Sequence, residues 1–277
     1  MHKDILLGKE TVYKASYDAS LIFPISRVDN RKKLSMPEKK VNNDLPFFGY
    51  DVWTGYEVSW LNEKGKPEVA IVEFIVPCES ENIVESKSFK LYLNSFNQTK
   101  LKGLDEAQAR MQEDLSKGFG GDIQVRFYDV MAYPLNQKGV GENIDGLDIE
   151  VTEYTPNAAL IKTLPERISE ALNSHLLKSN CPVTNQPDWA TLVVEYSGSK
   201  IDREALLKYV ISFRGHDDFH EHCVEQIFCD LLAAGEFDSL TVSARYTRRG
   251  GLDINPTRSL AAIKNTDESL IGRLARQ

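Results

Sequence analysis

A cysteine loop in residues 179–189 carries the side chains best suited to covalent chemistry. Cys181 is followed by Pro182, and Asp188 stands just before a strand-like run. A thiolate attacks an electrophilic carbon, and a neighbouring acid supplies the proton that the adduct needs. The alternative is a structural cysteine in a loop shaped by two prolines, since free cysteines are mostly small core residues.

A second candidate is the run Glu85-Ser86-Lys87-Ser88-x-Lys90, which opens an amphipathic segment. Ser86 is the expected N-cap. Free backbone N–H groups at a helix start, together with two lysines, would bind a phosphate. The alternative is an ordinary capped helix on the surface.

The stretch 216–223 is rich in histidine and acids. His216 and His220 could face the same way on a helix and bind zinc. No Cys-x-x-Cys or His-Glu-x-x-His pattern completes such a site. The rival role is polar recognition, in which Glu221 accepts two N–H groups of a planar base.

Arg248-Arg249-Gly250-Gly251 follows the last strongly strand-like run. Glycines let backbone approach a ligand and arginines bind phosphate, although an ordinary turn with exposed arginines has the same composition. No Gly-x-Gly-x-x-Gly follows a strand, which argues against a Rossmann domain and a Walker P-loop.

Composition narrows the class of protein. The chain has 277 residues and a net charge of −8, which argues against direct binding of a nucleic-acid backbone. Cys78, Cys181, Cys223 and Cys229 are too scattered for a disulfide framework. The first residues lack the apolar core of a signal peptide, and the most apolar run, 69–77, is too short to span a membrane. We expect a cytoplasmic enzyme or binding protein with no membrane partner.

Hydrophobic periodicity predicts similar elements in the two halves of the chain. Residues 1–50 look irregular and 131–160 look like a long connection. The first half has strands at 52–60 and 69–76, helices at 86–96 and 105–117, the latter stopping at Gly118, and a strand at 123–127. The second half has strands at 167–177 and 188–196, helices at 202–213 and 219–233, and a strand at 240–246.

Tyr-x-x-Ser-Phe occurs in both halves, ending at Phe96 and at Phe213. The chain therefore reads as two copies of a strand-strand-helix-helix-strand unit, and each helix pair needs a sheet face to bury its apolar stripe. We expect one module in residues 1–157 and a second in residues 158–277.

Several long motifs resemble those of the NADPH-dependent 7-cyano-7-deazaguanine reductase (QueF) family of queuosine biosynthesis, a tRNA modification pathway, in its long two-module form. Glu-Ser-Lys-Ser-x-Lys-Leu-Tyr starts at Glu85, Cys-Pro-x-Thr-x-Gln-Pro-Asp at Cys181 and Ser-Phe-Arg-x-His-x-x-Phe-His-Glu at Ser212. Arg-Arg-Gly-Gly starts at Arg248. The motifs stand in the family's order, and the resemblance covers most of the chain.

The resemblance implies an α+β architecture: tandem tunnelling-fold (T-fold) modules, each an antiparallel sheet with a helix pair packed on one face. It implies a homodimer, with barrels assembled between subunits. It also implies an oxidoreductase that reduces a nitrile to a primary amine with NADPH. Its partner is a small deazapurine substrate.

The resemblance assigns roles residue by residue. Cys181 would form a covalent thioimide and Asp188 would protonate the nitrile nitrogen. The base would be bound by Ile83, Val84, Glu85, His220 and Glu221, and NADPH by Ser86, Lys87, Arg249 and Gly250; no metal is expected. The alternatives are a zinc-dependent, cyclohydrolase-like enzyme on the same fold and a non-catalytic purine-binding module.

Overall fold

The computed structural model describes residues 14, 16–38, 40–134, 141–263 and 273–277. It divides into two compact units. Unit 1 takes the described residues of Met1–Lys32, Val52–Pro134 and Arg248–Asp253. Unit 2 takes those of Lys33–Asp51, Leu135–Thr247 and Ile254–Gln277.

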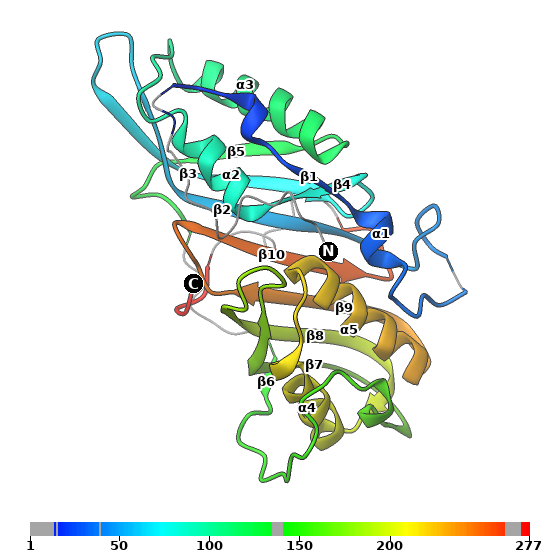
Figure 1. Cartoon of the computed structure of the whole chain (residues 1–277). Helices are drawn as coiled ribbons and strands as arrows, with labels where there is room; N and C mark the ends of the chain where they lie inside the picture. The colour runs from blue at the N-terminus through cyan, green and yellow to red at the C-terminus, as the bar shows by residue number, and fades with distance from the viewer. Residues whose placement is uncertain (1–13, 15, 39, 135–140, 264–272) are drawn as a thin grey trace. The chain divides into compact units, whose positions relative to one another are not determined.

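Unit 1 contains a sheet with helices packed against it (Figure 1). Its strand order is β5-β3-β2. A separate ladder pairs β1 with β4 in antiparallel fashion. The elements are η1 (Ala19–Leu21), β1 (Pro24–Ser26), α1 (Arg27–Arg31), β2 (Phe48–Leu61, from Val52 on in this unit), β3 (Pro67–Pro77), β4 (Asn82–Val84), α2 (Ser86–Asn94), α3 (Leu104–Phe119) and β5 (Gln124–Tyr128).

Aromatic side chains hold the helices of unit 1 on its strands. The Phe89 ring of α2 lies 4.9 Å from Trp53 of β2 and 5.1 Å from Phe74 of β3, between ring centroids. Phe119 of α3 lies 5.5 Å from Trp53. These rings are almost fully buried and supply much of the apolar area that stabilises the unit.

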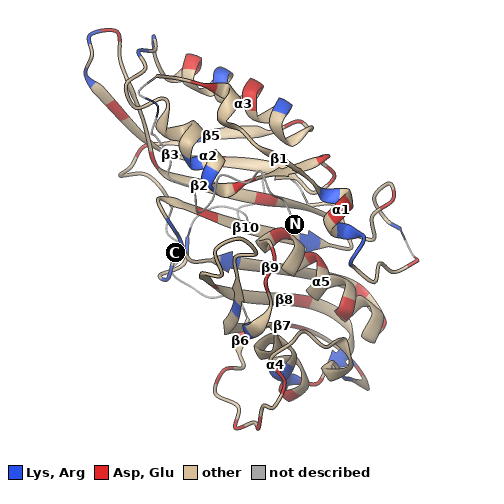
Figure 2. Ribbon diagram, viewed as in Figure 1, with Lys and Arg blue, Asp and Glu red and all other residues tan. Residues whose placement is uncertain are grey.

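The opposite side of α3 faces solvent. Acidic and basic residues alternate along it (Figure 2). Arg110 pairs with Glu106 at 2.7 Å and Lys117 with Glu113 at 2.6 Å, each four residues apart. Exposed pairs of this kind contribute little, so the helix is fixed by its buried face, which includes Met111, Leu115 and Phe119.

The predicted end of this helix at Gly118 is wrong. Gly118 lies inside α3, and a Cβ there would come within 2.5 Å of the Ile22 side chain. The glycine is therefore needed for close packing. The last helical residue is Phe119, and Gly120, two residues after Gly118, is the C-cap; its φ of 66° is the left-handed conformation that glycine adopts without strain.

Unit 2 has strand order β10-β9-β8-β7-β6, and α4 and α5 lie along its sheet (Figure 1). The β7–β8 and β8–β9 pairs are antiparallel, whereas the short β6 is parallel to β7. The elements are β6 (Glu142–Asn143), η2 (Ala158–Leu160), β7 (Thr163–Asn180), β8 (Pro187–Ile201), α4 (Arg203–Ser212), η3 (Phe213–Gly215), α5 (His220–Ala234), β9 (Phe237–Tyr246) and β10 (Leu252–Ser259, from Ile254 on in this unit).

A buried ionic group joins separate segments of unit 2. The guanidinium of Arg258 on β10 lies 2.7 Å from a carboxylate oxygen of Asp51 and 2.9 Å from one of Glu225 on α5. All three side chains are at most 3% exposed. One cation therefore balances two carboxylates that burial would otherwise penalise.

The predicted order strand-strand-helix-helix-strand is confirmed in both halves, with the short β4 and η3 added. The architecture is mixed α and β, with mainly antiparallel sheets. The prediction missed β10, and residues 1–50 hold short elements where only loops were expected; part of that stretch lies outside the described residues. Among the described helices, none is both long and apolar enough to cross a membrane.

Candidate active site

The predicted nucleophile lies in the connection of the β7–β8 hairpin. Cys181 directly follows β7, and its N–H donates to the Gln186 carbonyl at 2.9 Å. The N–H of Asn185 donates back to the Cys181 carbonyl, also at 2.9 Å. Asn185 has a φ of 56°, a left-handed conformation that asparagine tolerates better than most residues. The cysteine is thus held in a closed loop of defined shape.

Cys181 is the most accessible of the four thiols. It is 8% exposed, against 0% for Cys78 and Cys223 and 1% for Cys229. Burial raises the pKa of the Cys223 thiol well above its ordinary value, and nearby Asp218 raises it further. Cys223 is therefore an enclosed thiol that stays protonated at neutral pH, which disfavours it as a nucleophile.

Strand register places Asp188 and Tyr246 on one face of the sheet. Asp188 pairs with Ser179, and Ala190 pairs with Tyr246 of β9. Paired residues share a face, and so do residues two apart along a strand. All four residues are at most 4% exposed, consistent with a face covered by other parts of the unit.

His220, the first residue of α5, meets this face. Its Nε2 lies 3.4 Å from Oδ2 of Asp188. Its imidazole is stacked on the Tyr246 phenol, with ring centroids 3.7 Å apart and planes 1° from parallel. Burial raises the pKa of the Tyr246 hydroxyl well above its ordinary value, so the supporting ring stays neutral. The structure thus brings together two residues that the sequence analysis assigned to separate roles, His220 and Asp188, and Tyr246 fixes the imidazole plane.

Glu221 follows in the first turn of α5 and is 4% exposed. The N-cap residue, Phe219, has no side chain that can cap the helix. An acid in the first turn interacts favourably with the positive end of the helix dipole. The carboxylate is therefore held next to His220 as a buried acceptor group.

The remaining histidines contact a different acid. Nε2 of His216 lies 3.5 Å from Oδ2 of Asp218, and Nδ1 of His222 bonds to the same oxygen. His216 and His220 therefore approach separate carboxylates. Within the described ranges, no cluster of three or more His, Cys, Asp or Glu side chains has the arrangement of a metal site.

In unit 1, Glu85 rather than Ser86 caps α2, which corrects the predicted N-cap. The Glu85 carboxylate accepts N–H bonds from Lys87 at 2.9 Å and Ser88 at 2.7 Å. The longer side chain reaches the second and third helical positions, and Ser86 becomes the first residue of the helix. Each carboxylate oxygen accepts one of these two bonds, so further acceptor capacity is left. Ile83 and Val84, on β4, are buried beside it.

The run from Arg248 to Gly251 forms a tight turn in unit 1. The N–H of Arg249 donates to the Leu252 carbonyl at 2.9 Å, and Gly250 and Gly251 have φ of 58° and 72°. Both glycines are needed, since two successive left-handed residues are strained for other side chains. The Arg248 guanidinium lies 4.5 Å above the Tyr56 ring.

The predicted residues thus fall into two groups, and each group is ordered within its own unit. Unit 2 carries Cys181, Asp188, His220 and Glu221, whereas unit 1 carries Ile83, Val84, Glu85, Ser86, Lys87, Arg249 and Gly250. The sequence prediction missed Tyr246 and Tyr56 as supports. The alternation of apolar residues along their strands predicted burial for both tyrosines. It did not indicate that Tyr246 would contact His220 or that Tyr56 would contact Arg248.

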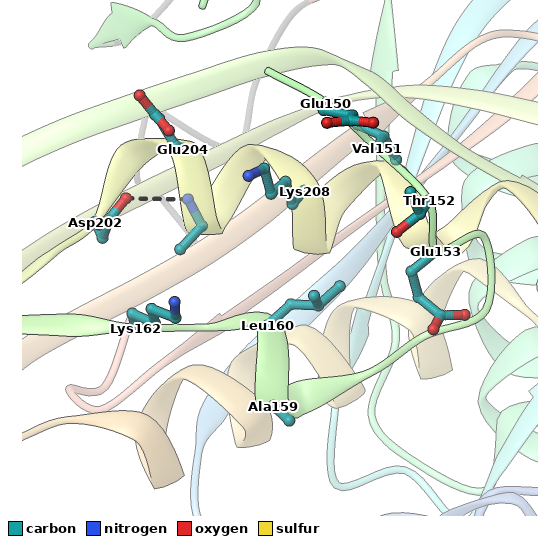
Figure 3. Close-up of a pocket in the computed structure, with 11 residues that line it drawn as sticks. Glu150, Val151, Thr152, Glu153, Ala159, Leu160, Lys162, Asp202, Glu204 and Lys208 are labelled. Atoms are coloured by element: carbon teal, nitrogen blue, oxygen red, sulfur yellow. Dashed lines mark hydrogen bonds between the residues drawn. The ribbon is translucent and has the colours of Figure 1, made fainter.

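Unit 2 also contains a groove of about 400 Å³ at the start of α4 (Figure 3). Asp202 caps that helix by accepting the Ala205 N–H at 3.0 Å. The acids Glu150, Glu153, Asp202 and Glu204 outnumber the lysines Lys162 and Lys208 in its lining. A net negative lining disfavours phosphate, and no predicted site residue belongs to it.

Comparison with known proteins shows which family this chain resembles. The family described as "Nitrile reductase, 7-cyano-7-deazaguanine-reductase N-term" matches residues 13–127, and the family "QueF-like protein" matches residues 187–265. Proteins named NADPH-dependent 7-cyano-7-deazaguanine reductase are similar over almost the whole chain. The protein of Cupriavidus metallidurans is 52% identical over 259 residues, covering 91% of this chain and 92% of the relative. That of Teredinibacter turnerae is 50% identical over 279 residues, covering 100% and 99%.

These matches define the class of protein as a nitrile reductase, an oxidoreductase built from an N-terminal and a QueF-like part. The chain belongs to the NADPH-dependent 7-cyano-7-deazaguanine reductase (QueF) family. The family resemblance inferred from the motifs is therefore confirmed.

Proposed function

We propose that this protein reduces the nitrile of 7-cyano-7-deazaguanine to the primary amine of 7-aminomethyl-7-deazaguanine, in queuosine biosynthesis, through a thioimide on Cys181. The observation that carries the proposal is the Asp188–His220 contact of 3.4 Å on the sheet face next to the Cys181 loop. A thiol nucleophile, a carboxyl proton donor and a supporting imidazole are the groups that addition to a nitrile requires.

In the first step, the Cys181 sulfur bonds to the nitrile carbon while one π bond of the C≡N group breaks. Asp188 delivers a proton to the nitrile nitrogen. Converting a nitrile to an ammonium group consumes two hydrides and three protons, so Asp188 must be reprotonated within each turnover. His220 is the residue suited to return protons, because its Nε2 faces the Asp188 carboxylate.

Later steps also use these residues. After the first reduction, the lone pair of the substrate nitrogen forms a C=N bond while the C–S bond breaks, so that Cys181 leaves as a thiolate and the substrate is left as a protonated imine. The resulting imine hydrolyses in water, so an enclosed site protects it. The 4% exposure of Asp188 and Glu221 supports such an enclosed environment.

Glu221 is the proposed anchor of the base, since a buried carboxylate can accept two parallel N–H bonds from the amidine edge of a guanine-like ring. Glu85 is proposed to assist with its remaining acceptor capacity, together with the backbone of Ile83 and Val84. The starts of α2 and α5 thereby supply two buried carboxylates, since Glu85 is 2% exposed and Glu221 is 4% exposed.

NADPH, when bound, supplies the hydrides. The side chains of unit 1 fit its phosphates: the Ser86 hydroxyl and the Lys87 ammonium lie at the start of α2, where Glu85 already accepts the N–H groups of Lys87 and Ser88. Arg249 and Gly250 lie in a turn whose glycines expose backbone. The negatively lined groove beside α4 does not fit them. Ser86 and Lys87 are proposed to bind phosphate oxygens, while Arg249 pairs with them as a fixed planar cation.

We also propose that the chain consists of two T-fold modules, with the boundary between residues 157 and 158. We further propose that two chains assemble into a homodimer. Analytical ultracentrifugation measures the assembly directly. A sedimenting species of two chain masses supports the dimer, and a monomer at all concentrations contradicts it.

The activity is tested by following NADPH oxidation with and without the nitrile. Two NADPH consumed per amine formed, and no oxidation without the nitrile, is the expected result. Turnover should also survive exhaustive chelation, because the thiol and the acid activate the nitrile. Stoichiometric zinc whose removal abolishes turnover would favour the cyclohydrolase-like alternative.

A further inference from the structure

The end of β7 is bound to the segment that leads into α5. The N–H of Asn180 donates to the His216 carbonyl at 2.8 Å, and its own carbonyl accepts the Asp218 N–H at 3.1 Å. The Asn180 side-chain amide donates to the Asp217 carboxylate at 2.9 Å. These contacts form a short parallel bridge between Asn180 and Asp217. Cys181 is the next residue after Asn180, just beyond the end of β7. His220 and Glu221 follow Asp217 by three and four residues.

Asp218 completes the connection from the helix side. Its Oδ1 accepts the Phe219 N–H at 2.8 Å, and its Oδ2 bonds to Nδ1 of His222. Asp218 is 6% exposed and His222 is 5% exposed. Burial alone would raise the pKa of Asp218, but the neighbouring His216 and His222 side chains outweigh it and lower the pKa well below its ordinary value. The carboxylate is therefore charged and saturated at neutral pH.

This arrangement replaces a conventional helix cap. Phe219 occupies the N-cap position and offers no side-chain acceptor. Asp218, one residue earlier, instead ties the backbone of Phe219 to the side chain of His222 in the first turn. The residues between these two ties are His220 and Glu221, so the tie fixes the turn that carries both.

We propose that Asn180 and Asp218 form a clamp, the 180–218 clamp, which positions the Cys181 loop against the first turn of α5. Asp218 and His222 are then positioning residues that act through Cys181, His220 and Glu221 without contacting the substrate. The expected effect on thioimide formation rests on the proposed function. The contacts of the clamp lie within unit 2 and do not depend on that function. A displacement of about 1 Å between reacting groups can slow a reaction about a hundredfold, so a modest loosening should be measurable.

The test uses matched variants at two positions. Asp218→Ala removes the two side-chain bonds, to the Phe219 N–H and to His222, and keeps the main-chain bond to Asn180. Asp218→Asn keeps an oxygen that accepts the Phe219 N–H and an amide that can face His222. His222→Leu removes the second tie, whereas His222→Asn keeps a nitrogen near the place of Nδ1. We expect Asp218→Ala and His222→Leu to slow thioimide formation at Cys181 at least tenfold, and the two asparagine variants to stay within about threefold of wild type.

Hydrogen exchange of the full chain measures the clamp without any substrate. Asp218→Ala should speed exchange at the Cys181 and Asn185 amides, which close the loop, and at the amides of the first turn of α5. Exchange in β2 and α2 of unit 1 should stay unchanged, which separates local loosening from general destabilisation. Unchanged exchange in the loop of a folded Asp218→Ala variant would overturn the proposal that the Asp218 side chain positions the loop.

The two proposals fail in distinguishable ways. A wild-type protein that forms no thioimide contradicts the proposed function, while loop exchange still judges the clamp. If the wild-type protein forms the thioimide and Asp218→Ala and His222→Leu form it at the wild-type rate, the positioning role is contradicted. A merely structural Asp218 would lower the melting temperature and leave the rate of adduct formation unchanged well below that temperature.

Discussion

The imidazole of His220 lies flat on the phenol ring of Tyr246, with the ring centroids 3.7 Å apart and the planes 1° from parallel. One residue comes from the start of α5 and the other from the end of β9. The stack leaves the imidazole one plane in which to lie, and in that plane Nε2 faces Asp188. Tyr246 thus contributes to the site through its ring.

The first prediction separates that ring from its hydroxyl. Tyr246→Phe keeps the stack and should retain turnover within about threefold, whereas Tyr246→Leu should lower it about tenfold or more, because the imidazole loses its fixed orientation. Steady-state rates with saturating nitrile measure the difference. Equal loss in both variants would assign the role to the hydroxyl.

The second prediction concerns Glu221. A charge-assisted hydrogen bond contributes about 1.5–3 kcal/mol, so Glu221→Ala should weaken nitrile binding at least tenfold while the fold survives. Calorimetry in a Cys181→Ala background measures binding without chemistry. Glu221→Gln, which keeps the shape of the side chain and loses its charge, is the matched control. Its affinity for the nitrile should lie between those of the unchanged Glu221 and of Glu221→Ala. Unchanged affinity of the alanine variant refutes the anchor.

The third prediction assigns Lys87 to the cofactor. Lys87→Ala should raise the Michaelis constant for NADPH yet form the thioimide at the normal rate, because the adduct precedes any hydride transfer. Lys117→Ala removes an equal charge from the exposed face of α3 and should change neither quantity. A folded Lys87→Ala variant that forms no adduct places the lysine in the base site instead.

The fourth prediction concerns stability. Arg258→Met leaves the buried carboxylates of Asp51 and Glu225 without their shared cation, so the free energy of unfolding should fall by about 3–5 kcal/mol. Arg167→Met is the control, because its partner Asp238 is exposed and such pairs contribute about 0–1 kcal/mol. Denaturant titration of both variants measures the contrast, and equal losses would contradict the role given to burial.

Much of the fold could be predicted from sequence because it follows from periodicity. Alternating residues gave the strands of both halves, and the apolar stripe containing Phe89 gave α2. The helix ends were less predictable, since they depend on neighbours. Gly118 is required by Ile22, which is distant in sequence, and Glu85 caps α2 because its longer side chain reaches two N–H groups.

The candidate site was likewise predictable where it depends on local sequence and unpredictable where it depends on contacts with other segments. Cys181, Asp188, His220 and Glu221 could be named from motifs, because each carries reactive or recognition chemistry. The supporting contacts could not. The stack on Tyr246 depends on how β9 lies against the start of α5. The bridge from Asn180 to Asp217 depends on how the end of β7 meets the segment before α5. Both contacts join segments that are distant in sequence, so no local pattern encodes them.

The most direct test of the proposed chemistry is the mass of the intact protein after mixing with 7-cyano-7-deazaguanine in the absence of NADPH. One added ligand mass per chain is expected, and peptide mapping should locate it on Cys181. Cys181→Ala should bind the nitrile without gaining mass. An adduct on Cys223 or Cys229, or a wild-type protein that binds the nitrile and gains no mass, would contradict covalent catalysis by Cys181.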